Sequence, residues 1–454
     1  MTFAQRPEGS AQAPSEMTGQ APGQALFQDS QRGPGPGPWA WVPSLYLLQG
    51  LPYVVVMSLS VVMYKNLGLS NTDIALYTSW LYLPWVIKPL WSPLIELLGT
   101  RRRWIWLLQF AVGAMVAMVA LSLPAEQWVR WSLALLWLMA FASASHDIAA
   151  DGYYMMALPT HQQAAFVGIR STFYRVANIA GQGGLVYLAG EVAERSGSAV
   201  LAWQLVMGLL AVCFVVGGLY HAWRLPYPGE DRPGEVRSSL FIEFFAVLGA
   251  FFRKPAIAVS IAYLLLYRFP EAQLLKLAAP FLLDPAQAGG LGLSTREVGV
   301  AYGTVGLIAL TVGGIVGGLL ISRFGLKACL WPLVWGMHLP NLVFLAMALW
   351  PPQQLWVVST ALAIEQFGYG VGFAAYLMVM ILIAEGPHKT AHYAICTGFM
   401  AMGMMVPGFW SGWLQEALGY VGFFAWVMVA AIPSFVMTAL IRVPQGFGRR
   451  EPAA

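Results

Sequence analysis

Residues 199–221 read AVLAWQLVMGLLAVCFVVGGLYH, a 23-residue apolar run without one acidic or basic (Asp, Glu, Lys or Arg) side chain. At a rise of 1.5 Å per residue, about 20 helical residues cross a hydrocarbon layer about 30 Å thick. A strand of this length would have to close into a barrel, and its side chains would alternate between apolar and polar. The run shows no such alternation, so it predicts a membrane-spanning helix.

The same pattern recurs along the chain. Apolar residues make up 58% of the sequence and charged residues only 10%, against about 25% charged in an ordinary soluble domain. The sequence therefore predicts an all-α integral membrane protein with twelve transmembrane helices. We expect them near 41–63, 74–96, 104–123, 130–157, 164–189, 199–221, 254–283, 298–321, 326–349, 355–383, 391–414 and 420–442.

The lysines and arginines predict how the chain is oriented. With the amino terminus in the cytoplasm, 16 of them fall in cytoplasmic segments and 4 on the opposite side. This positive-inside bias predicts a multi-pass inner (plasma) membrane protein with both termini cytoplasmic. The net charge of +4 follows from the same bias, and we expect no nucleic-acid partner.

An internal repeat divides the chain. Leu-Ser followed three residues later by an acid occurs at 69–73 and again at 293–297. Both copies would open a span on the same side of the membrane, which predicts a parallel repeat with the substrate held between the halves. We expect a disordered cytoplasmic tail at 1–38, six-helix halves at 39–221 and 254–443, a cytoplasmic linker at 222–253 and a tail at 444–454.

The linker contains an apolar stretch on a polar background at 237–252. It could form an amphipathic helix in the cytoplasmic membrane interface. The alternative is a simple tether between the halves.

A charged loop carries a resemblance to a superfamily. Ser92–Arg102 resembles the Gly-x-x-x-Asp-Arg-x-Gly-x-Arg-Arg loop of the major facilitator superfamily, with Glu96 in place of the Asp. A second copy in outline lies at 318–327. The resemblance implies the major facilitator fold of two six-helix halves.

Within that superfamily the chain resembles the AmpG-type muropeptide permeases and the related peptide and acetyl-coenzyme A transporters. The resemblance runs from about residue 45 to 415 and rests on Lys88–Leu94, Ser143–Ile148 with Asp151, Tyr174–Arg175 and Lys389–Ala394. It implies a secondary transporter that imports a small anionic or amino-sugar-containing solute, such as a muropeptide. A carrier for a peptide, sugar or drug is the alternative.

Charged side chains within apolar spans are the candidate substrate ligands, because ionised groups at mid-membrane face a bundle interior or an aqueous cavity. Arg175 and Arg268 come from opposite halves and lie near the midplane, and a guanidinium suits a carboxylate on a solute. We predict that they bind an anionic group. The alternative is that they pair with Asp147, Glu271 or Glu365 and hold the halves together.

Neighbouring side chains complete the predicted substrate site. Tyr174 precedes Arg175, and Glu365 lies near the middle of the tenth span. Tyr263, Tyr267 and Tyr369 lie on spans with buried charges and could stack on a sugar ring, although packing is the alternative for each.

Buried carboxylates are the candidate proton sites. Asp147 and Asp151 are four residues apart and share a helix face, with His146 beside the first. Repulsion between like charges in a poor dielectric favours protonation of one of them. Glu271 and Glu365 are the other candidates for proton coupling, while Asp151 alternatively neutralises nearby basic residues.

Charges near the predicted cytoplasmic ends could form a gate that shuts the inner side during alternating access. The predicted gating residues are Lys88, Glu96, Arg101, Arg102, Arg103, Asp151, Arg323 and Lys327.

Other function classes fit less well. His146 and Asp151 have the His-x-x-x-x-Asp spacing of glycerolipid acyltransferases, but both lie inside an apolar span. A membrane-embedded sensor would be expected to carry a soluble output domain. We expect no enzyme activity, no cofactor and no metal, and a monomer whose partners are a small solute, protons and the lipid bilayer.

Overall fold

The structure is a computed structural model that describes residues 36–91, 95, 98–158, 160–229, 231–232, 239–386 and 388–449. All regular secondary structure in these residues is helical. Nearly all of the predicted tail at 1–38, the end of the predicted tail at 444–454, and Glu96 lie outside the described residues.

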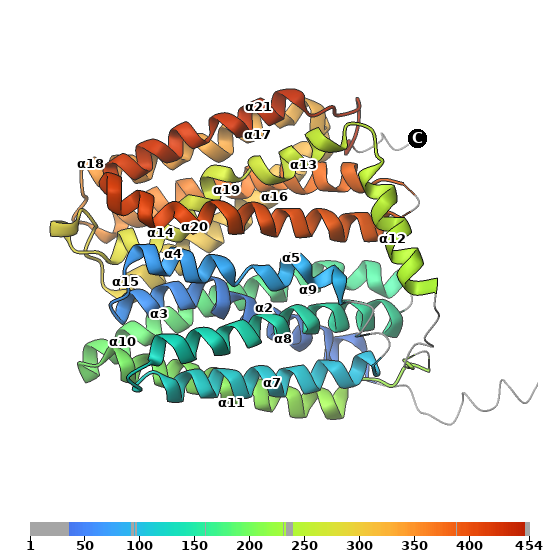
Figure 1. Cartoon of the computed structure of the whole chain (residues 1–454), viewed down its shortest axis with the longest axis horizontal. Helices are drawn as coiled ribbons and strands as arrows, with labels where there is room; N and C mark the ends of the chain where they lie inside the picture. Colours follow the sequence, from blue (N-terminus) through green and yellow to red (C-terminus); the bar gives the residue numbers. More distant parts are fainter. Residues whose placement is uncertain are drawn as a thin grey trace, which may run out of the picture.

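Helices from the first part of the chain lie side by side in the lower part of Figure 1. We call them the N-terminal bundle. They are α2 (Val42–Val54), α3 (Ser60–Asn66), α4 (Asn71–Trp80), α5 (Leu83–Ile87), α7 (Arg101–Ser122), α8 (Trp128–Ala157), α9 (Thr160–Ile179), α10 (Val186–Ser196) and α11 (Ala199–Arg224).

Most helices from the second part of the chain lie in the upper part of Figure 1, while the short helix Thr295–Val298 lies at the left beside helices of the first part. We call all helices of the second part the C-terminal bundle. They are α13 (Ile257–Leu266), α14 (Phe269–Leu283), α15 (Thr295–Val298), α16 (Leu307–Phe324), α17 (Leu326–His338), α18 (Leu342–Leu349), α19 (Leu355–Ala384), α20 (Lys389–Ala430) and α21 (Ile432–Leu440).

Helix α12 (Ser239–Phe252) runs across the ends of both bundles at the right of Figure 1. It is the helix that the apolar stretch at 237–252 predicted. We call this end of the molecule the α12 end and the opposite end, where α10, α15 and α18 lie, the α15 end. The positive-inside bias predicts that the α12 end is cytoplasmic.

Several long helices are interrupted. Three π-helical segments lie at Val55–Leu59, Ala180–Leu185 and Gly299–Gly306, and 3₁₀ turns lie at Pro38–Ala40, Lys88–Leu90, Ala286–Ala288 and Leu339–Asn341. Proline accounts for part of this, since Pro52 lies three residues before the first π segment and a proline ring removes a backbone hydrogen bond.

The interruptions change the count of spans. Of the described helices, eight are long and apolar enough to cross a membrane, or nine if the bent pair Phe245–Phe252 and Ile257–Leu283 forms one span. The predicted span at 74–96 is divided between α4 and α5, and α20 merges parts of two predicted spans across Gly419, whose φ is 68°. The protein is thus a multi-helix membrane protein, while the count of twelve stays a prediction.

The sequence repeat has a structural basis in helix capping. The Ser70 hydroxyl accepts a hydrogen bond from the Asp73 amide at the start of α4. Ser294 forms a full capping box with Glu297 at the start of α15. These caps satisfy amides that the first helical turn leaves unpaired.

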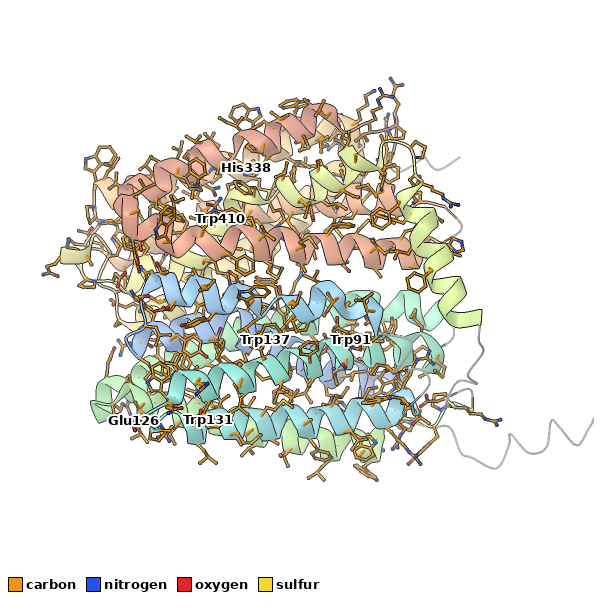
Figure 2. All side chains as sticks on the ribbon, viewed as in Figure 1. Trp91, Glu126, Trp131, Trp137, His338 and Trp410 are labelled. Atoms are coloured by element: carbon orange, nitrogen blue, oxygen red, sulfur yellow. The ribbon has the colours of Figure 1, made fainter. Side chains whose placement is uncertain are left out.

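Large apolar side chains cover the outer faces of both bundles (Figure 2). Trp131 on α8, labelled there, is 56% exposed, and Leu121 on α7 is 75% exposed. A soluble protein rarely exposes so much continuous apolar surface. These outer faces therefore suit contact with lipid.

Candidate functional site: a charged cavity between the bundles

A cavity of about 430 Å³ lies between the two bundles. Both bundles contribute polar side chains to its wall. Those used below are Tyr53, Lys88, Asp147 and Tyr174 from the N-terminal bundle, and Arg268, Lys276, Gln366 and Tyr369 from the C-terminal bundle.

On the N-terminal wall the charges are paired. The Lys88 ammonium donates to Oδ2 of Asp147 at 2.9 Å, and Gln49 donates to Oδ1 of the same carboxylate. Lys88 begins a 3₁₀ turn that ends the short helix α5, and Asp147 lies in the second half of α8. The turn therefore presents the ammonium to α8, and the wall carries an ion pair with little net charge.

On the C-terminal wall Arg268 lies at the break between α13 and α14. Pro270 follows within the first turn of α14, a position that proline favours because it needs no amide hydrogen. Arg268 is 7% exposed and donates through Nη2 to the Tyr369 hydroxyl. Its guanidinium carbon lies 4.8 Å from the ring centroid of Phe373.

The Arg268 guanidinium is incompletely satisfied. Its Nε is buried without a hydrogen-bond partner. No carboxylate among the described side chains forms an ion pair with it. The guanidinium therefore has free donors beside the cavity.

Lys276, two turns further along α14, is the second cation on this wall. It is 4% exposed and donates to the Thr78 hydroxyl of α4 at 2.8 Å. Its ammonium lies 5.1 Å above the Tyr82 ring, and no described carboxylate forms an ion pair with it. The sequence placed Lys276 inside a span, but no role was predicted for it.

Aromatic rings also line the cavity. Tyr53 packs edge-to-face on Trp85 with centroids 5.3 Å apart, and its ring lies 6.5 Å from that of Tyr174. Tyr369, one of the tyrosines predicted to stack on a sugar, lines the cavity as well. Such rings could contact the faces of a sugar.

Tyr263 and Tyr267 are not among the cavity-lining residues. They are fully buried and stack on each other with centroids 4.9 Å apart. The Tyr267 hydroxyl donates to the Gly372 carbonyl at 3.2 Å. The structure therefore assigns both rings to packing within the C-terminal bundle.

The predicted acids of the C-terminal bundle lie behind the cavity wall. Glu271 is buried against His338, with Oε1 and Nδ1 2.7 Å apart, and Asn341 donates to the same oxygen. Figure 2 labels His338 among the helices of this bundle. Glu365 is 1% exposed and accepts a hydrogen bond from the side chain of Gln366, which does line the cavity.

Arg175 lies outside the cavity, although its neighbour Tyr174 lines it. The Arg175 side chain is exposed and its guanidinium lies near Gly314 of α16. The structure therefore does not bring Arg175 and Arg268 into one site.

His146 points away from the cavity into the N-terminal bundle. Its Nε2 lies 3.0 Å from Nε2 of Gln109, whose Oε1 lies 2.8 Å from Nδ1 of His221. The Nε2 of His221 in turn lies 2.9 Å from the Ser44 hydroxyl. This buried polar chain joins α2, α7, α8 and α11, and the proton-coupling role of His146 stays a prediction.

The described gating residues lie near the α12 end, and the contacts of Asp151 and Lys88 stay within the N-terminal bundle. Asp151 accepts from the Tyr46 hydroxyl at 3.0 Å and pairs with Arg170 at 3.3 Å. Lys88 pairs with Asp147 rather than with Asp151.

The basic residues that follow Thr100 form hydrogen bonds mainly with the segment that follows α11. The backbone amides of Arg101 and Arg102 donate to the Asp231 carboxylate, and Arg102 donates through Nε to the Leu225 carbonyl at 3.0 Å. The Arg103 amide donates to the Thr100 hydroxyl. The side chains of Arg323 and Lys327 are exposed.

The two bundles are joined by polar contacts at the α15 end. Lys65 pairs with Asp284 at 2.6 Å, and Arg296 pairs with Glu191 at 3.2 Å. Asn71 also donates to Gln415 at 2.7 Å. These contacts were not predicted, because each joins residues more than a hundred positions apart and the sequence carries no local signal for them.

The backbones of the bundles also approach closely at the π segments. A Cβ atom on Gly303 would lie 1.9 Å from the Gln182 carbonyl oxygen, so only glycine fits there. Together with the ion pairs, this approach joins the two bundles on the side of the α15 end.

The described residues form an all-helical pair of bundles with a polar cavity between them and apolar outer faces that suit a membrane. The fold is that of solved transporters: the crystal structure of a D-xylose-proton symporter aligns with a TM-score of 0.66 at 12% identity, covering 90% of this chain and 98% of that chain. Residues 49–272 match the BT1 family.

Several curated relatives carry the names of transporters. The chain is 27% identical over 369 residues to the anhydromuropeptide permease of Escherichia coli K12, covering 79% of this chain and 70% of that protein. It is 24% identical over 409 residues to a transporter named AmpG 4 of Rickettsia conorii, covering 86% of this chain and 93% of that one. The predicted resemblance to AmpG-type permeases is confirmed, and these relatives are transporters rather than enzymes.

Proposed function

We propose that the protein is a proton-coupled secondary transporter that imports a small anionic, amino-sugar-containing solute of the muropeptide class. The observation that carries the proposal is the charge of the cavity. Arg268 and Lys276 face it without a carboxylate partner among the described side chains, while Lys88 is neutralised by Asp147. An anionic solute would supply the missing negative charge.

The name of the E. coli relative supports the choice of solute, since it is an anhydromuropeptide permease. The aromatic rings of Tyr53, Trp85 and Tyr174 suit the sugar, and the cations of α14 suit carboxylates. A cavity of about 430 Å³ falls within the roughly 300–1,000 Å³ usual for small-molecule sites.

Proton coupling is assigned to Asp147. It is the one carboxylate among the described residues that line the cavity, and its partner is the Lys88 ammonium. A proton on Asp147 would break this ion pair and release Lys88 to the solute. Binding of the proton and of the anion would then favour each other, as symport requires.

The deciding experiment is uptake by proteoliposomes that contain the purified protein. An imposed proton gradient should drive accumulation of a labelled anhydromuropeptide, and an uncoupler should abolish it. A panel of uncharged amino sugars, neutral peptides and xylose tests the alternative solutes. Accumulation that persists with the uncoupler would refute proton coupling, and uptake of the neutral solutes alone would refute the anionic class.

A control variant separates the cavity from the rest of the protein. Arg130 is exposed at the start of α8 and does not line the cavity. Arg130→Gln removes one positive charge and should transport like the unaltered protein.

A further inference from the structure

We propose that Lys276 is a second anion-binding residue, so that the cavity selects a solute with two anionic groups, one for Arg268 and one for Lys276. This inference rests on the proposed function and adds to it. It names a residue for which the sequence predicted no role and a requirement on the number of anionic groups of the substrate.

The contacts of Lys276 leave it available to a ligand. Its side chain is buried, and its hydrogen-bond partner in the structure is the neutral Thr78 hydroxyl at 2.8 Å. An ammonium group carries three hydrogen-bond donors. A buried cation within a membrane is costly unless it is paired, so an unpaired one beside a cavity points to a ligand.

Arg268 supplies the first anion site in the same way. It contacts the Tyr369 hydroxyl, and its Nε is buried without a partner. A guanidinium has five donors arranged to grip a carboxylate through two of them. Both cations therefore have unused donors on the same cavity wall.

The two cations have separate partners. Arg268 immediately precedes α14 and donates to Tyr369 of α19, while Lys276 lies eight residues later and donates to Thr78 of α4. These partners belong to different bundles, so we assign one anionic group to each cation.

The test uses an anhydromuropeptide with two free carboxylates and its two singly amidated forms, with transport measured in proteoliposomes. The unaltered protein should bind the diacid at least tenfold more tightly than either amidated form. Lys276→Gln should weaken binding of the diacid at least tenfold. It should change binding of one amidated form less than threefold. Arg268→Gln should show the same pattern with the other amidated form.

Two further variants keep a folding defect from being mistaken for a lost site. Lys276→Arg retains the charge and should retain the preference for the diacid. Thr78→Val removes the hydroxyl partner of Lys276 and should also retain it.

Two results would overturn the inference while leaving the proposed function intact. In the first, the unaltered protein transports all three forms equally. In the second, Lys276→Gln weakens binding of all three forms by the same factor, which would make Lys276 a structural link between α14 and α4. If the unaltered protein transports none of the three forms, the proposed function itself fails.

Discussion

The two walls of the cavity differ in whether their charged side chains form ion pairs. On the N-terminal wall Lys88 is paired with Asp147, whereas on the C-terminal wall Arg268 and Lys276 donate to neutral hydroxyls and form no ion pair with a described carboxylate. The paired wall can change its charge by binding one proton. The unpaired wall attracts an anion. The difference suggests that the N-terminal bundle senses the proton and the C-terminal bundle holds the solute.

The largest effect is expected from Asp147→Asn. Without a carboxylate the wall can no longer take up a proton in exchange for releasing Lys88, so gradient-driven accumulation should fall at least tenfold. Exchange of labelled for unlabelled solute, which needs no net proton movement, should continue. Both can be measured in the same proteoliposomes.

The control for this prediction is the double variant Lys88→Gln/Asp147→Asn. It removes both charges and avoids leaving a buried ammonium unpaired, which is strongly destabilising. If Asp147→Asn still accumulates solute against a gradient, the N-terminal wall is not the proton site, and Glu365 becomes the next candidate.

Arg268→Gln tests the unpaired wall and should have the second largest effect. A hydrogen bond to a charged group contributes about 1.5–3 kcal/mol, which corresponds to a loss of about ten- to a hundredfold in affinity. The apparent affinity for the anionic solute in uptake assays is the measurement. Equal affinities of Arg268→Gln and the control Arg130→Gln would show that Arg268 is structural.

Asp151→Asn tests whether a second ion pair of the N-terminal bundle, in addition to Lys88–Asp147, is needed for transport. Asp151 pairs with Arg170 inside the same bundle, and the two side chains are 40% and 31% exposed. Partly exposed pairs contribute about 1 kcal/mol or less. We therefore expect transport to change less than threefold.

Labelling of cysteines placed across the α12 end provides a second measurement for Asp151→Asn. A gating role requires faster labelling in the variant, because the closed state at that end would be weakened. A large fall in transport together with faster labelling would restore Asp151 as a gate.

The smallest effect is expected at the α15 end, where Glu191 of the N-terminal bundle meets Arg296 of the C-terminal bundle. The hydrogen bond from Arg296 holds the pKa of Glu191 below its ordinary value of 4.5. A lowered pKa in the folded state means that the contribution to stability is present above pH 4.5 and is lost as the pH falls through the folded pKa.

Thermal unfolding of the unaltered protein and of Glu191→Gln, followed from pH 7 to pH 3, measures this contribution. The two proteins should differ slightly at pH 7 and converge at the acidic end. A difference that grows on acidification would contradict the assignment.

The sequence by itself determined the membrane character of the protein and singled out several of the charged residues that line the cavity. Apolar runs long enough to span a bilayer identify the helices, because backbone groups in lipid must be satisfied within each segment. The cost of burying charge singles out Asp147, Arg268 and Lys276 as in-span charges. The repeated Ser caps at Ser70 and Ser294 are likewise local, because a cap involves residues three apart.

Only the tertiary structure decided which of these charges meet. Lys88 and Asp147 are 59 residues apart, and Arg268 and Tyr369 are 101 apart, so their contacts depend on how separate helices pack. Adjacent residues on a helix point about 100° apart, which is why Tyr174 lines the cavity and Arg175 does not. Breaks at π segments and prolines shift these directions further, and they arise from packing that no local pattern encodes.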